Sequence, residues 1–273
     1  MAEKTKIIIA GMGGQGVQTI AGILASTIVQ SGLAASYIPQ FGVEQRGTPS
    51  VAFVVLSPEK IGYPLFGAAD WALILHPGAI GAIAGHTDKK TKIIFDSSLM
   101  GVQELDEKSA EIFGLPAVRL AAEKFSLRAT NLIILGKMGR LLNLSFDSLW
   151  RKTAEFLGKK LKYGASKKES KEALSAGYKS PLEEKNFSKP SHRPQTGVIT
   201  FSGAGKKGFV LPESCKSCGI CLVKCPVGAI KFSKRTGVFA SPLPEIDIEK
   251  CTVCGICSLY CPDGAIKVEK SVK

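Results

Sequence analysis

Cysteine is absent from the first 214 residues of this 273-residue chain, and all eight cysteines lie between Cys215 and Cys261. A targeting segment is also absent, because the apolar run after Lys6 is short and ends at the glycines of GMGGQG. Without an oxidising compartment, closely spaced cysteines indicate metal or redox chemistry rather than disulfides. We therefore expect a cytoplasmic protein whose carboxyl-terminal part binds metal.

Other absences exclude further classes of protein. No charge lies between Lys6 and Glu44, but glycine and glutamine interrupt this span, so it does not predict a membrane helix. The chain has only three histidines, His76, His86 and His192, without the spacing of a ligand pair or a nucleophilic triad. It is therefore not expected to be an enzyme on its own.

The net charge of +13 is unevenly distributed. Residues 1–157 carry 15 basic and 13 acidic side chains, residues 158–205 carry 10 and 4, and residues 206–273 carry 11 and 6. Nearly half of the excess positive charge therefore lies in residues 158–205, which connect the two parts of the chain. Their end, residues 179–205, is rich in proline, serine and lysine, which predicts an exposed linker. No aromatic side chains alternate with the basic ones, so nucleic-acid binding is not expected.

A sixteen-residue cassette occurs twice: CKSCGICLVKCPVGAI begins at Cys215, and CTVCGICSLYCPDGAI begins at Cys251, 36 positions later. Structural zinc sites commonly pair two Cys-x-x-Cys knuckles across a loop, whereas each cassette offers three closely spaced cysteines and a fourth before proline. The spacing C-x2-C-x2-C-x3-C-P is typical of two-cluster bacterial ferredoxins. The duplication therefore predicts an electron relay of two 4Fe-4S clusters.

In this cysteine pattern the first three cysteines of a cassette bind one cluster, while the fourth binds the neighbouring cluster. Gly219 and Gly255 let the backbone approach the sulfurs, and Pro226 and Pro262 redirect the chain after each fourth cysteine. The predicted ligands of the first cluster are Cys215, Cys218, Cys221 and Cys261, and those of the second are Cys251, Cys254, Cys257 and Cys225. Neither cassette is expected to assemble alone.

The amino-terminal part predicts an α/β fold with a mostly parallel sheet. KIIIAGM indicates a buried strand, GGQG a turn, and VQTIAGILASTIVQ a helix with its apolar side chains on one face. Apolar runs at 50–57, 70–77 and 91–98 alternate with turn signals and helical stretches. Residues 131–162 indicate two helices, and Ser145 is placed to cap the second.

The glycines Gly11, Gly13 and Gly16 match the dinucleotide fingerprint G-x-G-x-x-G between a strand and a helix. The acidic residue that would bind a ribose hydroxyl after the second strand is missing, since Glu44 comes late and follows a glycine. Three interpretations remain open: a dinucleotide site, a tight turn with close helix packing, or a site for an anion or a partner subunit at the helix amino terminus.

Three stretches, in the order GMGGQGVQTIAGILA, QFGVEQRGTPS and NLIILGKMG, resemble the gamma subunit of the 2-oxoacid:ferredoxin oxidoreductases. The two cassettes resemble their delta subunit, so the chain looks like a gamma-delta fusion over about residues 5–175 and 205–270. The resemblance implies a Rossmann-like gamma-subunit domain at 1–178 and, after the linker, an α+β ferredoxin-like domain at 206–273.

The resemblance also implies a complex that decarboxylates a 2-oxoacid, forms an acyl-coenzyme A and sends electrons through iron-sulfur clusters to ferredoxin or flavodoxin. Because this sequence has no Gly-Asp-Gly followed by Asn-Asn, thiamine diphosphate and its magnesium are expected in partner alpha and beta subunits. Coenzyme A is the implied co-substrate. The candidate cofactor-binding residues of this chain are Gly11, Gly13, Gly14 and Gly16 of the fingerprint loop, together with Arg46. Arg46 matches the Arg-Gly element of the gamma family, which implies a contact to coenzyme A phosphates or to a neighbouring subunit; a solvated turn is the alternative. The alternative function is a stand-alone iron-sulfur electron-transfer protein whose glycine loop holds a flavin or nicotinamide.

Polar residues also follow predicted strands, where α/β folds place ligands: His76 follows one strand, and Asp96 and Ser97 follow another. A turn at His76 and helix capping by Ser97 or Ser98 are the simpler interpretation. Asn131 lies in one of the stretches that resemble the family, at a position that also suits the start of a helix.

Overall fold

The structure is a computed structural model that describes residues 4–42, 47–105, 111–158, 166–184, 187, 190 and 194–271. The chain divides into two compact units, Met1–His192 and Arg193–Lys273, each with its own hydrophobic core. Among the described residues, no helix is both long and apolar enough to cross a bilayer.

The larger unit is built on a six-stranded sheet. Its strands are β1 (Thr5–Met12), β2 (Ala34–Phe41), β3 (Pro49–Ser57), β4 (Trp71–Ile74), β5 (Lys92–Phe95) and β6 (Glu111–Gly114). They lie in the order β2-β3-β1-β4-β5-β6. β1, β4, β5 and β6 are parallel, whereas β3 runs antiparallel to both of its neighbours.

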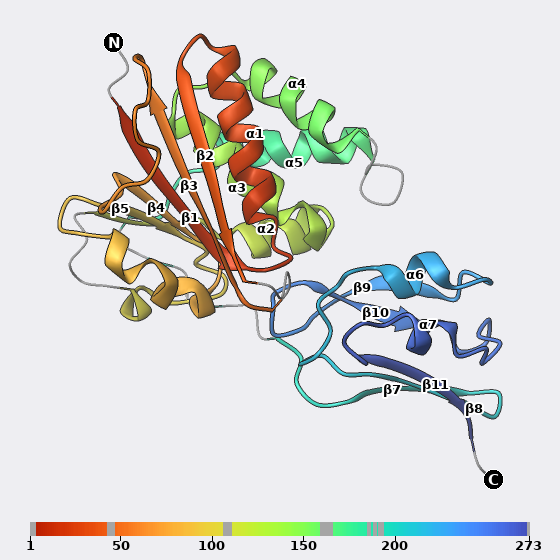
Figure 1. Cartoon of the computed structure of the whole chain (residues 1–273). Coiled ribbons are helices and arrows are strands. Elements are labelled where there is room, and N and C mark those ends of the chain that lie inside the picture. Colours follow the sequence, from red (N-terminus) through yellow and green to blue (C-terminus); the bar gives the residue numbers. More distant parts are fainter. Residues whose placement is uncertain are drawn as a thin grey trace. The chain divides into compact units, whose positions relative to one another are not determined.

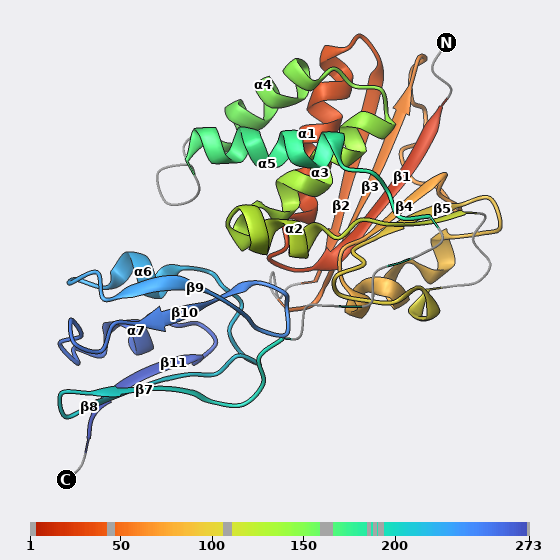
Figure 2. The same ribbon diagram turned by 180° about the vertical axis from the view of Figure 1, so that it is seen from behind.

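The α-helices of this unit cover one face of the sheet, as Figures 1 and 2 show. They are α1 (Val17–Gln30), α2 (Ala117–Lys124), α3 (Thr130–Leu141), α4 (Phe146–Leu157) and α5 (Lys167–Lys179), and the 3-10 helices are η1 (Pro77–His86), η2 (Val102–Glu104) and η3 (Leu127–Ala129). Successive strand residues point to opposite faces, so Ile7 and Ile9 pack beneath the α-helices while Ile8 and Ala10 pack with η1. β1 is therefore buried on both faces, which explains its continuous apolar run.

The predicted α/β fold is confirmed, and the strand order refines it. The apolar runs at 50–57, 70–77 and 91–98 contain β3, β4 and β5. Ser145 caps α4 as predicted, because its hydroxyl accepts a hydrogen bond from the Ser148 N–H at 3.2 Å. The sequence did not predict that β3 lies between β1 and β2, since strand order depends on pairing between segments far apart in the chain.

Helices α3 and α5 approach each other at two glycines. A Cβ atom added to Gly136 would clash with the Leu174 carbonyl oxygen, and one added to Gly177 would clash with the Ile133 carbonyl oxygen. No side chain fits between backbones this close, so both positions require glycine.

The smaller unit repeats one arrangement of strand, cassette, helix and strand. Its elements are β7 (Ile199–Gly203), β8 (Lys206–Val210), α6 (Ile220–Lys224), β9 (Ile230–Thr236), β10 (Pro242–Ile246), α7 (Ile256–Leu259) and β11 (Ile266–Lys270). One sheet has the order β11-β8-β7 and the other pairs β10 with β9, all antiparallel. Val210 pairs with Ile266 just as Ile246 pairs with Ile230, and equivalent residues are 36 positions apart.

Candidate metal centre

The two cassettes follow the same backbone path. Gly219 and Gly255 have left-handed φ values of 76° and 74°, and each precedes a short helix. Ser217 and Val253, at equivalent positions, have φ values of 53° and 57°. This conformation is unfavourable for a β-branched residue, yet it lets the Val253 N–H point at Cys251 Sγ at 3.5 Å.

Four cysteines from both cassettes line one hollow. Cys215, Cys218 and Cys221 come from the first cassette, and Cys261 comes from the second. The structure thus brings together the four residues predicted for the first cluster.

A second hollow has the reciprocal set of cysteines. Cys251, Cys254 and Cys257 line it from the second cassette, and Cys225 lines it from the first. The four residues predicted for the second cluster therefore also lie together, with the fourth cysteine of the first cassette beside three of the second.

Four of the eight cysteines are buried, and burial makes their thiolates costly. Burial raises the pKa of Cys221 to about 12 and that of Cys215 to about 11, and the neighbouring cysteines add to both rises. Burial also raises the pKa of Cys257. Such thiols are protonated near neutral pH, so a metal that binds their thiolates must displace protons. Metal binding at these sites is therefore expected to strengthen as the pH rises.

Backbone N–H groups point at the fourth sulfur of each cassette. The Ala229 N–H donates to Cys225 Sγ at 3.2 Å, and the Ala265 N–H donates to Cys261 Sγ at 3.2 Å. Hydrogen bonds of this kind stabilise thiolate ligands and tune the potential of an iron-sulfur cluster.

The thiols surround their hollows rather than converging on one point. Among the described residues, no three His, Cys, Asp or Glu side chains lie close enough together to hold a single metal ion. A zinc site brings its four thiolates to about 2.3 Å from one ion. A 4Fe-4S cluster instead spreads its four cysteines around a larger body.

The glycine-rich loop between β1 and α1 is closely packed. Gly14 and Gly16 have positive φ values of 105° and 83°. A Cβ atom on Gly16 would lie 2.6 Å from Asn131 Nδ2, and one on Gly11 would lie 2.8 Å from Gln15 Oε1. Asn131 therefore packs against this loop from α3, and close packing accounts for two of the glycines.

Part of the loop's backbone is already hydrogen-bonded. Gln15 Oε1 accepts from the Met12 N–H at 2.7 Å, and the Thr48 carbonyl accepts from the Gly13 N–H at 2.8 Å. In the dinucleotide-binding fold the second strand lies beside the first, whereas here β3 separates them. In that fold the acidic residue that binds the ribose ends the strand beside the first, and here the end of β2 does not lie beside β1. Arg46, the other predicted contact, lies outside the described residues.

Both units match families of known proteins. Residues 6–180 match the family described as pyruvate ferredoxin/flavodoxin oxidoreductase, and residues 214–265 match the 4Fe-4S dicluster domain. This chain belongs to the pyruvate ferredoxin/flavodoxin oxidoreductase family. The predicted combination of a gamma-type domain with a two-cluster domain is confirmed.

One relative is the 2-oxoglutarate synthase subunit KorC of Archaeoglobus fulgidus, which is 30% identical over 149 residues. The match covers 53% of this chain and 74% of KorC. The pyruvate/ketoisovalerate oxidoreductases common subunit gamma of Pyrococcus furiosus is 31% identical over 141 residues, 49% of this chain and 76% of that protein. The ketoisovalerate oxidoreductase subunit VorA of Methanothermobacter marburgensis is 30% identical over 136 residues, 50% of this chain. That match spans only 28% of VorA.

Solved structures share the fold of this oxidoreductase-family chain. The pyruvate oxidoreductase subunit PORC of Thermotoga maritima has a TM-score of 0.53 at 17% identity, over 68% of this chain and 100% of that one. The 2-oxoglutarate:ferredoxin oxidoreductase of Magnetococcus marinus has a TM-score of 0.58 at 22% identity, over 74% of this chain and 35% of that one. Identities this low show a common fold.

Polar residues that follow β5 cap the amino terminus of α2. The Asp96 carboxylate accepts from the Ser98 N–H at 2.9 Å and the Val118 N–H at 3.0 Å, and the Ser98 hydroxyl accepts from the Arg119 N–H at 3.1 Å. Burial raises the pKa of Asp96 to about 6. The buried Ser97 hydroxyl has no partner among the described residues. Capping of α2 thus falls to Asp96 and Ser98.

His76 takes the local role that its place before proline predicted. Its Nδ1 accepts from the Gly78 N–H at 3.0 Å, at the start of η1. This contact orients the turn after β4.

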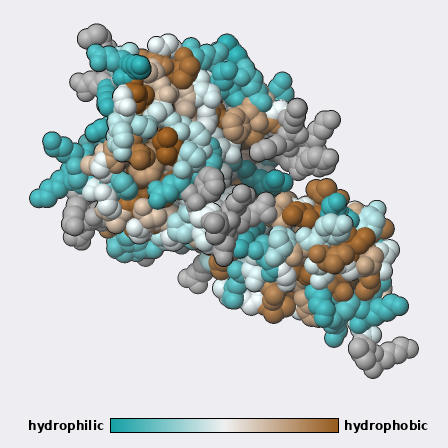
Figure 3. Space-filling view, viewed as in Figure 1, coloured by the Kyte–Doolittle hydropathy of each residue, from teal (hydrophilic) through white to brown (hydrophobic). Residues whose placement is uncertain are grey.

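Exposed apolar residues beside the fourth cysteine of each cassette were not predicted from the sequence. Val223 on α6 is 61% exposed and Leu259 on α7 is 81% exposed. The Lys224 ammonium lies 4.8 Å from the centroid of the Tyr260 ring. Figure 3 shows hydrophobic residues gathered over these two helices. Apolar residues inside a cassette are easily assigned to the core, and only the folded chain shows that these are not buried.

Proposed function

We propose that this chain is the gamma and delta part of a 2-oxoacid:ferredoxin oxidoreductase. It would relay electrons from thiamine diphosphate-dependent decarboxylation of a 2-oxoacid, which yields an acyl-coenzyme A and CO2, to ferredoxin or flavodoxin. The observation that supports this proposal is that a gamma-type family domain precedes a dicluster domain in the same chain. The eight cysteines of the dicluster domain lie in two groups of four. The chain is not catalytic alone.

Each 4Fe-4S cluster would be held by three cysteines of one cassette and the fourth cysteine of the other. A bound cluster supplies transfer of single electrons. The chain's own residues orient the sulfurs through the N–H groups of Ala229 and Ala265. Apolar side chains that line the two hollows limit access of water: Ile230, Ile246, Ile266 and Val268.

The larger unit is proposed to dock onto alpha and beta subunits that hold thiamine diphosphate and magnesium. Gly11, Gly13, Gly14, Gly16 and Arg46 are the proposed contacts to a partner or to the phosphates of coenzyme A. The names of relatives, which are oxidoreductase subunits, support a multi-subunit complex.

Exposed apolar side chains beside the cysteines of the smaller unit support contact with a partner protein. Eight free thiols support a cytoplasmic location.

Two double variants test the exchanged ligands. Cys215→Ala with Cys261→Ala removes two predicted ligands of the same cluster, so anaerobically purified protein should retain about four irons per chain. Cys215→Ala with Cys225→Ala removes the same number of cysteines from one cassette but damages both clusters, so iron should fall toward zero. The opposite ranking would show that each cassette binds its own cluster.

Activity of the assembled complex tests the proposed function. Cys261→Ala should abolish ferredoxin reduction, while the complex with its thiamine diphosphate-containing subunits still decarboxylates its 2-oxoacid. An unchanged rate of ferredoxin reduction contradicts the relay. A chain that purifies alone with a flavin absorption band supports the stand-alone electron-transfer protein instead.

A further inference from the structure

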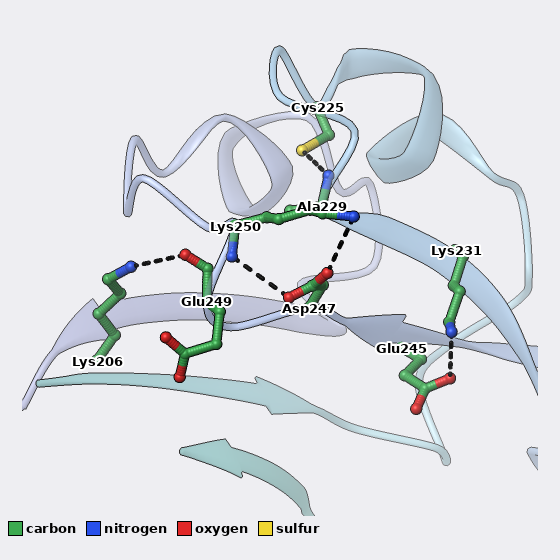
Figure 4. Close-up of polar contacts among 8 residues, drawn as sticks. All are labelled: Lys206, Cys225, Ala229, Lys231, Glu245, Asp247, Glu249 and Lys250. Carbon is green, nitrogen blue, oxygen red and sulfur yellow. Dashed lines mark hydrogen bonds and ion pairs between the residues drawn. The ribbon is translucent and has the colours of Figure 1, made fainter. Parts of the chain in front are cut away.

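Lys206, on β8, lies against the first cysteine of the second cassette. Its ammonium donates to the Cys251 carbonyl at 2.7 Å and to the Ile248 and Glu249 carbonyls at 3.3 Å each. Figure 4 shows the side chain reaching the backbone at Glu249. The contact with the Cys251 carbonyl places a positive charge within roughly 9 Å of the Cys251 sulfur by summed bond lengths.

The internal repeat supplies a matched comparison for this lysine. The residue 36 positions later is Pro242, at the start of β10. Pro242 lies against the first cassette, because its carbonyl accepts a hydrogen bond from the Ser217 hydroxyl. The site of Cys215 therefore has an uncharged residue where the site of Cys251 has an ammonium.

The remaining charges at the two hollows add to this difference. Lys216 and Asp263 both line the first hollow and form an ion pair at 2.9 Å, so their charges largely cancel. The residues that line the second hollow include no charged side chain. Among the described residues no carboxylate lies within ion-pair distance of the Lys206 ammonium.

Two further influences, the N–H···S bonds to the fourth cysteines and the exposure of one ligand, are equal or act in the same direction. The N–H···S bonds to Cys225 and Cys261 are both 3.2 Å long. Cys254 is exposed, whereas its equivalent Cys218 is half-buried. Solvent and positive charge both favour the more negative, reduced form of a cluster.

We infer that Lys206 raises the reduction potential of the cluster at Cys225, Cys251, Cys254 and Cys257 above that of the other cluster. The first electron to enter the smaller unit then rests at this site. The inference rests on the proposed function, because it requires a cluster at each group of four cysteines. Lys206 acts as a positioning and electrostatic residue and is not a ligand.

A redox titration of the purified chain, followed by low-temperature paramagnetic resonance, tests this order. Cys254→Ser and Cys218→Ser each change one ligand of one cluster, and so assign the two signals to their sites. Cys254→Ser should alter the signal that appears first on reduction. The inference is overturned when Cys218→Ser alters that signal instead, and this result needs no Lys206 variant.

The contribution of Lys206 has its own test. Lys206→Met should lower the potential of the cluster assigned to Cys254 and leave the other unchanged, whereas Lys206→Arg should retain the wild-type value. Lys207→Met is the matched control, because it removes the same charge from the next, exposed residue of β8. Equal shifts in Lys206→Met and Lys207→Met, or no shift in either, contradict the inference. A wild-type chain without iron contradicts the proposed function itself.

Discussion

The two units of this chain have cores of different chemistry. The largest fully buried side chains, among them Phe95, Ile7 and Leu24, all belong to the larger unit. The core of the smaller unit includes four buried cysteines: Cys215, Cys221, Cys251 and Cys257. Burial of aliphatic side chains stabilises a fold at about 25 cal/mol per Å² without any ligand, whereas a thiolate site contributes to folding only when metal is bound. The units are therefore expected to differ in what unfolds them.

Removal of iron should have the largest effect. Anaerobic chelation is expected to unfold residues 206–270, while the larger unit stays folded, because only the smaller unit depends on thiolate–iron bonds. Backbone hydrogen exchange measures the smaller unit. Fluorescence reports on the larger one, since Trp71 and Trp150 are the chain's two tryptophans. If the amides of residues 206–270 stay protected from exchange in iron-free protein, the smaller unit does not depend on iron for folding, and the proposed difference between the two cores is contradicted.

Gly177→Ala should destabilise the larger unit alone. The new methyl group would overlap the Ile133 carbonyl, so we expect a loss of about 3 kcal/mol in free energy of unfolding, although alanine usually stabilises a helix relative to glycine. Urea unfolding followed by tryptophan fluorescence measures the loss, with iron content expected to be unchanged. Gly81→Ala is the control, because a Cβ atom added to Gly81 would have no neighbour within 4 Å. Equal stabilities of the two variants would contradict the close helix approach.

The stability of the larger unit should depend on pH through Asp96. Its pKa is raised from 3.8 to about 6 in the folded chain, so the folded state binds the proton more tightly than the unfolded state. The resulting stabilisation is fully present below about pH 4 and is lost as the pH rises through 6, a fall of roughly 3 kcal/mol. Asp96→Asn cannot ionise and should lack this fall in urea titrations at pH 4 and pH 7. An identical pH dependence in both proteins would assign it to other groups.

Loss of the cap on α4 should have the smallest effect. Ser145→Ala removes the acceptor for the Ser148 N–H and is expected to lower the free energy of unfolding by about 1 kcal/mol. Ser145→Asp restores an acceptor and should recover most of the loss in the same fluorescence assay. Failure of aspartate to recover stability would argue that the hydroxyl acts in another way.

Features that depend on neighbouring residues were predictable from the sequence. The cysteine spacing predicted both groups of four, because the spacing within a cassette is local and its duplication predicts that the fourth cysteine of each cassette lies with the other cassette. Ser145 was predictable as a cap, because the N–H group that donates to its hydroxyl lies three residues away. The dinucleotide fingerprint at Gly11 and Gly16 was less informative, since packing against Gln15 and Asn131 demands glycine as well.

The amino-acid sequence by itself therefore determined the α/β class of the larger unit and the grouping of the cysteines. Only the tertiary structure decided the placement of β3 between β1 and β2, the capping of α2 by Asp96, and the contact of Lys206 with the Cys251 carbonyl. The physical reason is distance along the chain. Lys206 and Cys251 are 45 residues apart, and no local propensity or spacing encodes which of many lysines a folded backbone will bring to a given carbonyl.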